Sequence, residues 1–215
     1  MPERRMCFAV MNSLESRNQV QQDLLIGDLK EGLEHAVKVS NLAYFLGREL
    51  GETEKICVEL ANAGMVHDIG KMRLSSYLYG RVEDSWKIES NKYMRLHSQL
   101  GYEILKEFQY SDFVLETVKY HHENYDGSGY PENLKGKDIP YGARIMRVCD
   151  VFAALTSDRP YRKAFEQDAA MELMAEEFKN FDMKIFLAFQ RMICSGDMDD
   201  ILQNRQLVLG EKKAE

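Results

Sequence analysis

The apolar residues of this chain recur with a helical period along most of its length. Between residues 27 and 50 they return every three or four positions, at Leu33, Ala36, Val37, Ala43 and Leu46, and Gly51 follows as a stop signal. Comparable patterns predict further helices over residues 53–66, 93–108, 112–120, 141–155, 166–179 and 183–194. No stretch has convincing strand character. The pattern therefore predicts an all-α fold, a single-domain helical bundle.

Two segments interrupt the helical pattern. Residues 72–92 have no clean period, and we expect a connecting loop there with at most a short helix. Residues 123–131 hold two glycines and a proline, which favours a tight, stiff loop. The predicted organisation is a short leader over residues 1–24, one domain over residues 25–195 and a tail over residues 196–215.

Composition narrows the functional classes. The 215 residues are 45% hydrophobic and 29% charged, which is ordinary for a globular protein. No apolar run approaches the roughly 18 to 20 residues of a membrane span, and no signal peptide is evident, so we expect a cytoplasmic protein without a membrane partner. The net charge of −7, without a basic block, argues against binding long nucleic acids. The four cysteines are far apart, which suits a reducing compartment.

The pair His67-Asp68 ends the second predicted helix, and Gly70 and Lys71 follow it. A carboxylate has two oxygens and can bridge two metal ions while the adjacent imidazole binds one of them. Lys71 would then stand beside the metals as a cation suited to a phosphate oxygen. Taken alone, a His-Asp dipeptide is more often a surface or capping feature.

Eight imidazoles and carboxylates fall at predicted helix ends or on inner helix faces, and they include every histidine of the chain: Glu31, His35, His67, Asp68, His97, His121, His122 and Asp150. A lone histidine on a helix is more often a core residue, and Glu31 with His35 could form an ordinary surface pair. As a set without thiolates, however, these side chains suit iron, manganese or magnesium rather than structural zinc. Eight ligands are too many for one ion and suit two or three.

A site with two or three metals has a specific use in phosphate chemistry. A bridging hydroxide serves as nucleophile while the metals hold a phosphate in line. In this interpretation Asp68 bridges the metals and orients the hydroxide, and Lys71 offsets charge on the phosphate in the transition state. These two residues are the catalytic candidates.

Several motifs of the chain together resemble the HD-GYP domain, and the resemblance covers about residues 27–190. They are His35, His67-Asp68 with Gly70-Lys71, His97, His121-His122, the loop from Asp126 to Pro131, and Asp150 with the segment from Thr156 to Lys163. The resemblance implies a helical bundle whose metal centre hydrolyses the bacterial second messenger cyclic di-GMP to pGpG and in some members to GMP. Through Glu31 it implies a third ion, and from the donor set we expect Fe or Mn as the metal. It also implies that Tyr130, Arg159 and Arg162 contact the substrate.

The chain departs from the family pattern at two positions. Ser98 stands where the family usually has proline, which is tolerable in the first turn of a helix. Ala153 stands where the family usually has aspartate. If that aspartate contacts the guanine, the base preference of this chain is weaker or altered.

Three other interpretations stay open at this stage. The domain could bind cyclic di-GMP or dock a diguanylate cyclase without turnover. It could hydrolyse another cyclic dinucleotide, such as cyclic GMP-AMP, or a simpler nucleotide, and Ala153 is the feature that allows this. The histidines could also be incidental. A regulatory protein acting in trans and a homodimer are further partner hypotheses.

Overall fold

The structure is a computed structural model, which describes residues 29–78, 94–158 and 162–195. By its internal contacts the chain divides into two units, Met1–Glu34 and His35–Glu215. In the first unit, residues 29–34 are helical and exposed. Every candidate ligand except Glu31 falls in the second unit. The predicted leader and tail lie outside the described residues, so the predicted domain limits stay a prediction.

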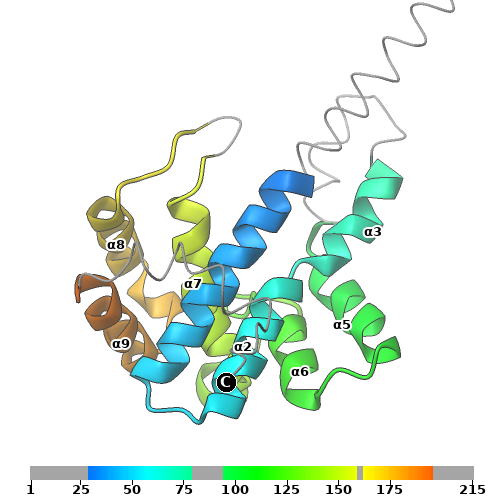
Figure 1. Ribbon diagram of the computed structural model, residues 1–215, viewed down its shortest axis with the longest axis horizontal. Coiled ribbons are helices and arrows are strands. Elements are labelled where there is room, and N and C mark those ends of the chain that lie inside the picture. Colours follow the sequence, from blue (N-terminus) through cyan, green and yellow to red (C-terminus); the bar gives the residue numbers. More distant parts are fainter. Residues whose placement is uncertain (1–28, 79–93, 159–161, 196–215) are drawn as a thin grey trace, which may run out of the picture. The chain divides into compact units, whose positions relative to one another are not determined.

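The second unit is built from helices. Residues 35–49 are helical, and the helices that follow are α2 (Glu54–Val66), α3 (Ile69–Leu78), α5 (His97–Glu107), α6 (Asp112–Tyr120), α7 (Tyr141–Leu155), α8 (Gln167–Glu176) and α9 (Met183–Cys194) (Figure 1). Two 3-10 turns, η1 (Gly136–Asp138) and η2 (Phe178–Asn180), lie in the connections. No β-strand occurs in the described ranges. The predicted all-α fold class is confirmed.

Local sequence sets several helix ends. The side chains of Thr53 and Ser111 accept the backbone N–H of Ile56 and Val114, so each satisfies a free donor in the first turn of its helix. Gly51 adopts a φ of 80° just after the helix over residues 35–49, a conformation that glycine takes at little cost. These ends agree with the predicted ones.

Helix α7 forms much of the core. It packs against α2, α6, α8 and α9 (Figure 1), and nine of its 15 residues are buried. Phe152 of α7 meets Phe189 of α9 edge to face, with ring centroids 5.1 Å apart. In so buried a helix a carboxylate must be paired or bound to a metal ion, because burying an isolated charge is costly. Asp150 is that carboxylate.

Helix α3 is the short helix that the prediction allowed within residues 72–92. Residues 72–78 are helical and continue α3, whereas residues 79–93 lie outside the described residues. The apolar period is weak because α3 packs mainly on α5 through a close backbone approach. A Cβ atom on Gly70 would overlap the carbonyl oxygen of His97. Glycine at this position thus permits a contact that sequence periodicity cannot report.

None of the described helices combines the length and the apolar character that a membrane crossing requires.

Candidate metal centre

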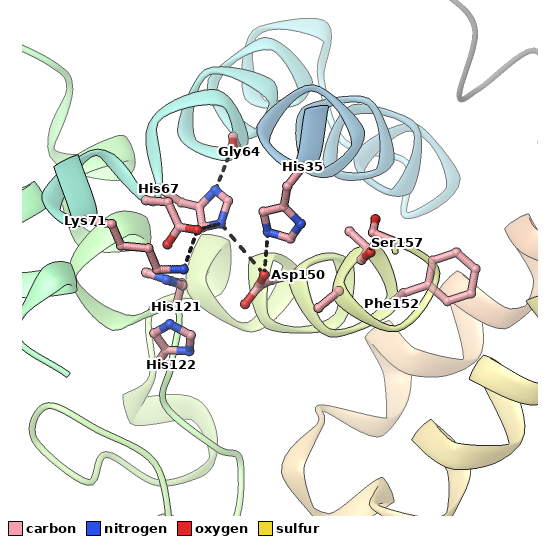
Figure 2. Close-up of polar contacts among 12 residues, drawn as sticks. His35, Gly64, His67, Lys71, His121, His122, Asp150, Phe152 and Ser157 are labelled. Atoms are coloured by element: carbon pink, nitrogen blue, oxygen red, sulfur yellow. Dashed lines mark hydrogen bonds and ion pairs between the residues drawn. The ribbon is translucent and has the colours of Figure 1, made fainter. Parts of the chain in front are cut away.

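The candidate ligands come mostly from helix ends. His67 is the C-cap residue of α2 and His121 the C-cap residue of α6, so Asp68 and His122 follow directly after the last turns. His97 is the first residue of α5. His35 and Asp150 instead lie within helices, at residues 35–49 and in α7. Figure 2 shows the labelled side chains of His35, His67, His121, His122 and Asp150 directed toward one another.

Three of the histidines are oriented by the helix backbone itself. Nδ1 of His67 lies 2.7 Å from the carbonyl oxygen of Gly64, and Nδ1 of His121 lies 2.7 Å from that of Val118. His97 makes the same contact with Met94. A carbonyl oxygen only accepts, so Nδ1 carries a proton in each ring, and Nε2 is the atom that offers a lone pair when the ring is neutral. This is the usual orientation of a metal-binding histidine.

The first ligand group consists of His35, His67 and Asp150. Nε2 of His35 lies 3.0 Å from Oδ1 of Asp150, and Nε2 of His67 lies 3.8 Å from the same oxygen. Nε2 of His67 is completely buried and has no hydrogen-bond partner. Because an unpaired buried nitrogen is costly, this geometry favours a cation between the three side chains.

The second ligand group consists of Asp68, His97, His121 and His122. Nε2 of His97 lies 3.3 Å from Nε2 of His121 and 3.1 Å from Nε2 of His122. In the neutral rings of His97 and His121 both Nε2 atoms carry lone pairs. Two lone pairs that face each other repel unless a proton or a metal ion lies between them. The second group therefore also fits a cation.

Asp68 joins the two groups. Its Oδ2 lies 3.3 Å from Nε2 of His67, and its Oδ1 lies 3.3 Å from Nε2 of His97. Each carboxylate oxygen thus faces one ligand group, as a bridging ligand requires. Lys71 reaches the same carboxylate, with Nζ 2.6 Å from Oδ2.

The charges of the centre are strongly coupled. Burial alone would raise the pKa of Asp68, but the charges of His67 and Lys71 outweigh it and hold that pKa well below its ordinary value. Burial opposes the charged form of His67, yet Asp68 and Asp150 raise its pKa to about 9. Burial lowers the pKa of His122 to about 3 and that of His121 well below its ordinary value. The second group therefore offers neutral imidazoles, which is the form that binds metals.

Together, the two groups fit divalent metal ions. Among the described residues they contain seven of the eight predicted ligands, all of them nitrogen or oxygen donors. Oδ1 of Asp68 and Nδ1 of His35 are further buried atoms without hydrogen-bond partners. Imidazole and carboxylate donors without thiolate suit iron, manganese or magnesium. The ligand role of these seven residues is supported by their position.

A stiff loop follows His122 and is held from inside by Glu123. This carboxylate is 1% exposed, and its two oxygens accept the backbone N–H groups of Glu132 and Leu134 at 2.7 and 3.1 Å. Gly129 lies so close to the backbone of residues 122–124 that a Cβ atom would overlap it. The loop is therefore folded back onto the end of α6.

Tyr130 of this loop lies beside a candidate ligand. Its ring stacks on that of His122, with centroids 4.7 Å apart, and the guanidinium carbon of Arg95 lies 5.3 Å from its centroid. The structure thus places this predicted substrate contact beside the second ligand group. Tyr130 and Arg95 therefore lie together at the edge of the centre.

The remaining predicted site residues lie elsewhere or outside the described set. Arg162 donates to the carbonyl oxygens of Ala154 and Leu155, so its guanidinium closes the C-terminal end of α7. Arg159 lies outside the described residues. Glu31 belongs to the first unit, and its role as ligand of a third ion stays a prediction. Ala153 is completely buried.

Sequence reasoning missed Arg147 and Asn124. Nε of Arg147 donates to Oδ1 of Asn124 at 3.0 Å. Arg147 stands three positions before Asp150, so both lie on the same face of α7. A charged residue on a largely buried helix, besides Arg144 and Asp150, was the available signal. Its partner comes from a loop 23 positions away, which no pattern of spacing reveals.

The structure combines an all-α unit with two adjoining groups of imidazole and carboxylate side chains, which one aspartate joins. This combination is typical of a helical domain suited to binding metal ions. The chain belongs to the HD domain family, whose model matches residues 19–185. The HD-GYP membership inferred from the motifs is confirmed.

Two curated relatives carry names of enzymes. A cyclic di-GMP phosphodiesterase of Pseudomonas aeruginosa is 36% identical over 160 residues, which cover 74% of this chain and 38% of the relative. A 3'3'-cGAMP-specific phosphodiesterase of Vibrio cholerae is 33% identical over 157 residues, which cover 71% of this chain and 36% of the relative. The chain thus spans well under half the length of these two relatives.

A solved structure has a similar fold. It is that of a cyclic GMP-AMP specific phosphodiesterase of V. cholerae, with a TM-score of 0.61 and 17% sequence identity, over 79% of this chain and 47% of the other. At this identity the similarity concerns the fold, and it agrees with the predicted helical bundle.

Proposed function

We propose that this chain is a metal-dependent phosphodiesterase that hydrolyses cyclic di-GMP to pGpG, with GMP as the product of a second cleavage. The observation that carries the proposal is the carboxylate of Asp68, whose two oxygens face the two ligand groups at 3.3 Å each. Divalent ions bound by these groups would supply an ionised water as nucleophile and would polarise the phosphate. The names of the curated relatives support the same reaction class.

The residues of the chain orient this chemistry. The backbone carbonyls of Gly64, Met94 and Val118 hold three imidazoles in one tautomer, so that no rotation is needed when a ligand binds. Lys71 is half exposed, and it is anchored to Oδ2 of Asp68. From there its ammonium can offset the negative charge that develops on the phosphate.

The finer details of cofactor and location belong to this proposal. We expect two iron or manganese ions, and a third if Glu31 joins the first group. The described cysteines Cys57, Cys149 and Cys194 are free, and the first two are buried, which supports a reducing, cytoplasmic location. A homodimer and a partner acting in trans stay predictions.

Substrate contacts come from the edge of the centre. Tyr130 is an aromatic residue beside the ligands, and a purine can stack on its ring where it takes the place of Arg95. Arg159 and Arg162 are proposed contacts from the family resemblance. To contact the substrate, the guanidinium of Arg162 has to release the carbonyl oxygens of Ala154 and Leu155, or share an N–H group between them and the substrate.

Hydrolysis of 3'3'-cyclic GMP-AMP is a second candidate function. Ala153 favours it, because this position offers a buried methyl group where the family usually has a carboxylate. Without a carboxylate that accepts a hydrogen bond from the amino group of guanine, the preference for guanine over another base is reduced. A relative named as cyclic GMP-AMP specific supports this candidate.

Product analysis tests the proposal. The full chain is purified without oxygen, loaded with Fe(II) or Mn(II), and given cyclic di-GMP and cyclic GMP-AMP in parallel. We expect linear products from at least one of them, and the ratio of kcat/KM values reports the base preference. Binding of cyclic di-GMP without turnover by a fully loaded protein would instead identify a receptor. Asp68→Ala serves as the inactive control.

A further inference from the structure

Arg147 is a charged residue of the site that neither ligand group uses. It lies three positions before Asp150 on α7, about 4.5 Å along the helix axis and on the same face. Its side chain is partly exposed. It is also close enough to interact electrostatically with Asp150, Tyr130 and His122. Arg147 thus stands beside both the metal ligands and the aromatic edge of the centre.

Only one end of the guanidinium is held. Nε of Arg147 donates to Oδ1 of Asn124, and Asn124 in turn donates through Nδ2 to Ser128 at 3.0 Å. Nη1 and Nη2 of Arg147 make no hydrogen bond or ion pair with the described residues. A planar guanidinium fixed at Nε presents these two groups as a parallel pair of donors, a geometry that matches two oxygens of a phosphate.

The charge balance around Arg147 calls for an anion. A carboxylate that interacts with it electrostatically belongs to Asp150, which is also a candidate metal ligand. With two divalent ions in place, the arginine lacks an acidic partner of its own and adds to the positive charge of the centre. A bound phosphate relieves this repulsion. Arg95, over the ring of Tyr130, adds a second cation on this side.

We propose that Arg147, held by Asn124, binds the phosphate of the cyclic dinucleotide that is not being cleaved. This inference rests on the proposed function. The cleaved phosphate already has the metal ligand groups and Lys71, which reaches the centre from α3 through Asp68. Arg147 reaches it from α7 through Asn124, so the two cations stand on different elements. A substrate with two phosphates in one ring matches two separate cation sites.

The test compares two diesters in the metal-loaded full chain. Cyclic di-GMP has two phosphates, whereas bis(p-nitrophenyl) phosphate has one. In Arg147→Gln we expect KM for cyclic di-GMP to rise about 10- to 100-fold, the loss of one charge-assisted contact. We expect kcat for cyclic di-GMP, kcat/KM for the small diester and the metal content to stay at wild-type values. Asn124→Ala should raise KM in the same direction by a smaller factor.

Arg191→Gln is the matched control. Arg191 lies on α9, is 65% exposed and pairs with Glu49, so this variant removes the same charge away from the centre. Its KM for cyclic di-GMP should equal that of the wild type. An Arg147→Gln variant with unchanged KM would overturn the inference. So would equal losses of kcat on both diesters, because they would place Arg147 at the cleaved phosphate.

Failure of the proposed function gives a different result. If the wild-type chain leaves cyclic di-GMP intact, the proposed function fails, and the dissociation constant of intact cyclic di-GMP becomes the readout for Arg147. A weaker affinity of Arg147→Gln would then support the phosphate contact, and an equal affinity would overturn it. Absence of any binding by the wild type would overturn both proposals.

Discussion

The most demanding prediction concerns Glu123, a buried carboxylate next to the metal ligands. Its oxygens accept the backbone N–H groups of Glu132 and Leu134, and so they tie the returning loop to the end of α6. Glu123→Gln keeps one side-chain oxygen and replaces the other with an amide NH2 group. One backbone N–H then faces a donor, and the remaining hydrogen bond loses the assistance of a charge.

The expected cost follows from these two contacts. A hydrogen bond to a charged group contributes about 1.5–3 kcal/mol, so we expect Glu123→Gln to lower the free energy of unfolding by about that amount. For a domain of this size, 1 kcal/mol corresponds to about 2–4 °C, and the melting temperature should fall by about 3–12 °C. Because the same loop carries Tyr130, KM for the cyclic dinucleotide should also rise.

Denaturant titration of the metal-loaded protein measures the first effect, and steady-state kinetics measure the second. Glu132→Gln is the matched control, because its side chain lies in the same loop but forms a surface pair with Lys119. We expect the control to cost less than about 1 kcal/mol, as exposed ion pairs do. If Glu123→Gln were as stable as Glu132→Gln, the loop would not depend on the buried carboxylate.

Three further predictions address other parts of the site. For Gly70→Ala we expect a lower metal content and a free energy of unfolding lower by about 1–3 kcal/mol or more, because its Cβ would overlap the backbone of α5. Gly32→Ala, with open space around the new methyl group, should change neither quantity. Equal metal content and stability of the two variants would contradict the close approach. Tyr130→Ala should raise KM for the cyclic dinucleotide roughly tenfold, because the stacking contact is lost. Tyr130→Phe should keep the wild-type KM, because the hydroxyl makes no hydrogen bond to the described residues. Equal KM values in the two variants would refute the aromatic contact. Lys71→Met should keep its metal, measured by elemental analysis, while kcat falls about 10²- to 10³-fold; unchanged kcat would remove Lys71 from the chemistry.

The positions of the candidate metal ligands could be predicted because these residues lie at places that a sequence pattern marks. His67 and His121 follow directly on the last turns of amphipathic helices, and Asp150 interrupts an apolar helix. The helical period therefore predicted the positions of these side chains relative to the core. The predicted limits of α7 and α9 agree with the structure for the same reason.

Contacts between segments distant in sequence could not be predicted in this way. Helix α3 depends on a close approach between Gly70 and α5, and its apolar residues do not recur with a clear helical period. Arg147 depends on Asn124, and Glu123 depends on two backbone groups of the following loop. Arg162 was assigned to the substrate by resemblance, yet its donors meet the end of α7. These partners are visible only once the chain is folded.

The most direct test of the two-group metal centre is an anomalous diffraction map of the chain crystallised with Mn(II) or Fe(II). We predict two peaks bridged by the carboxylate of Asp68, one among His35, His67 and Asp150 and the other among His97, His121 and His122. A third peak coordinated by Glu31 would support the predicted third ion. A single peak, or a carboxylate of Asp68 that touches only one ion, would contradict the bridging role on which the proposed reaction depends.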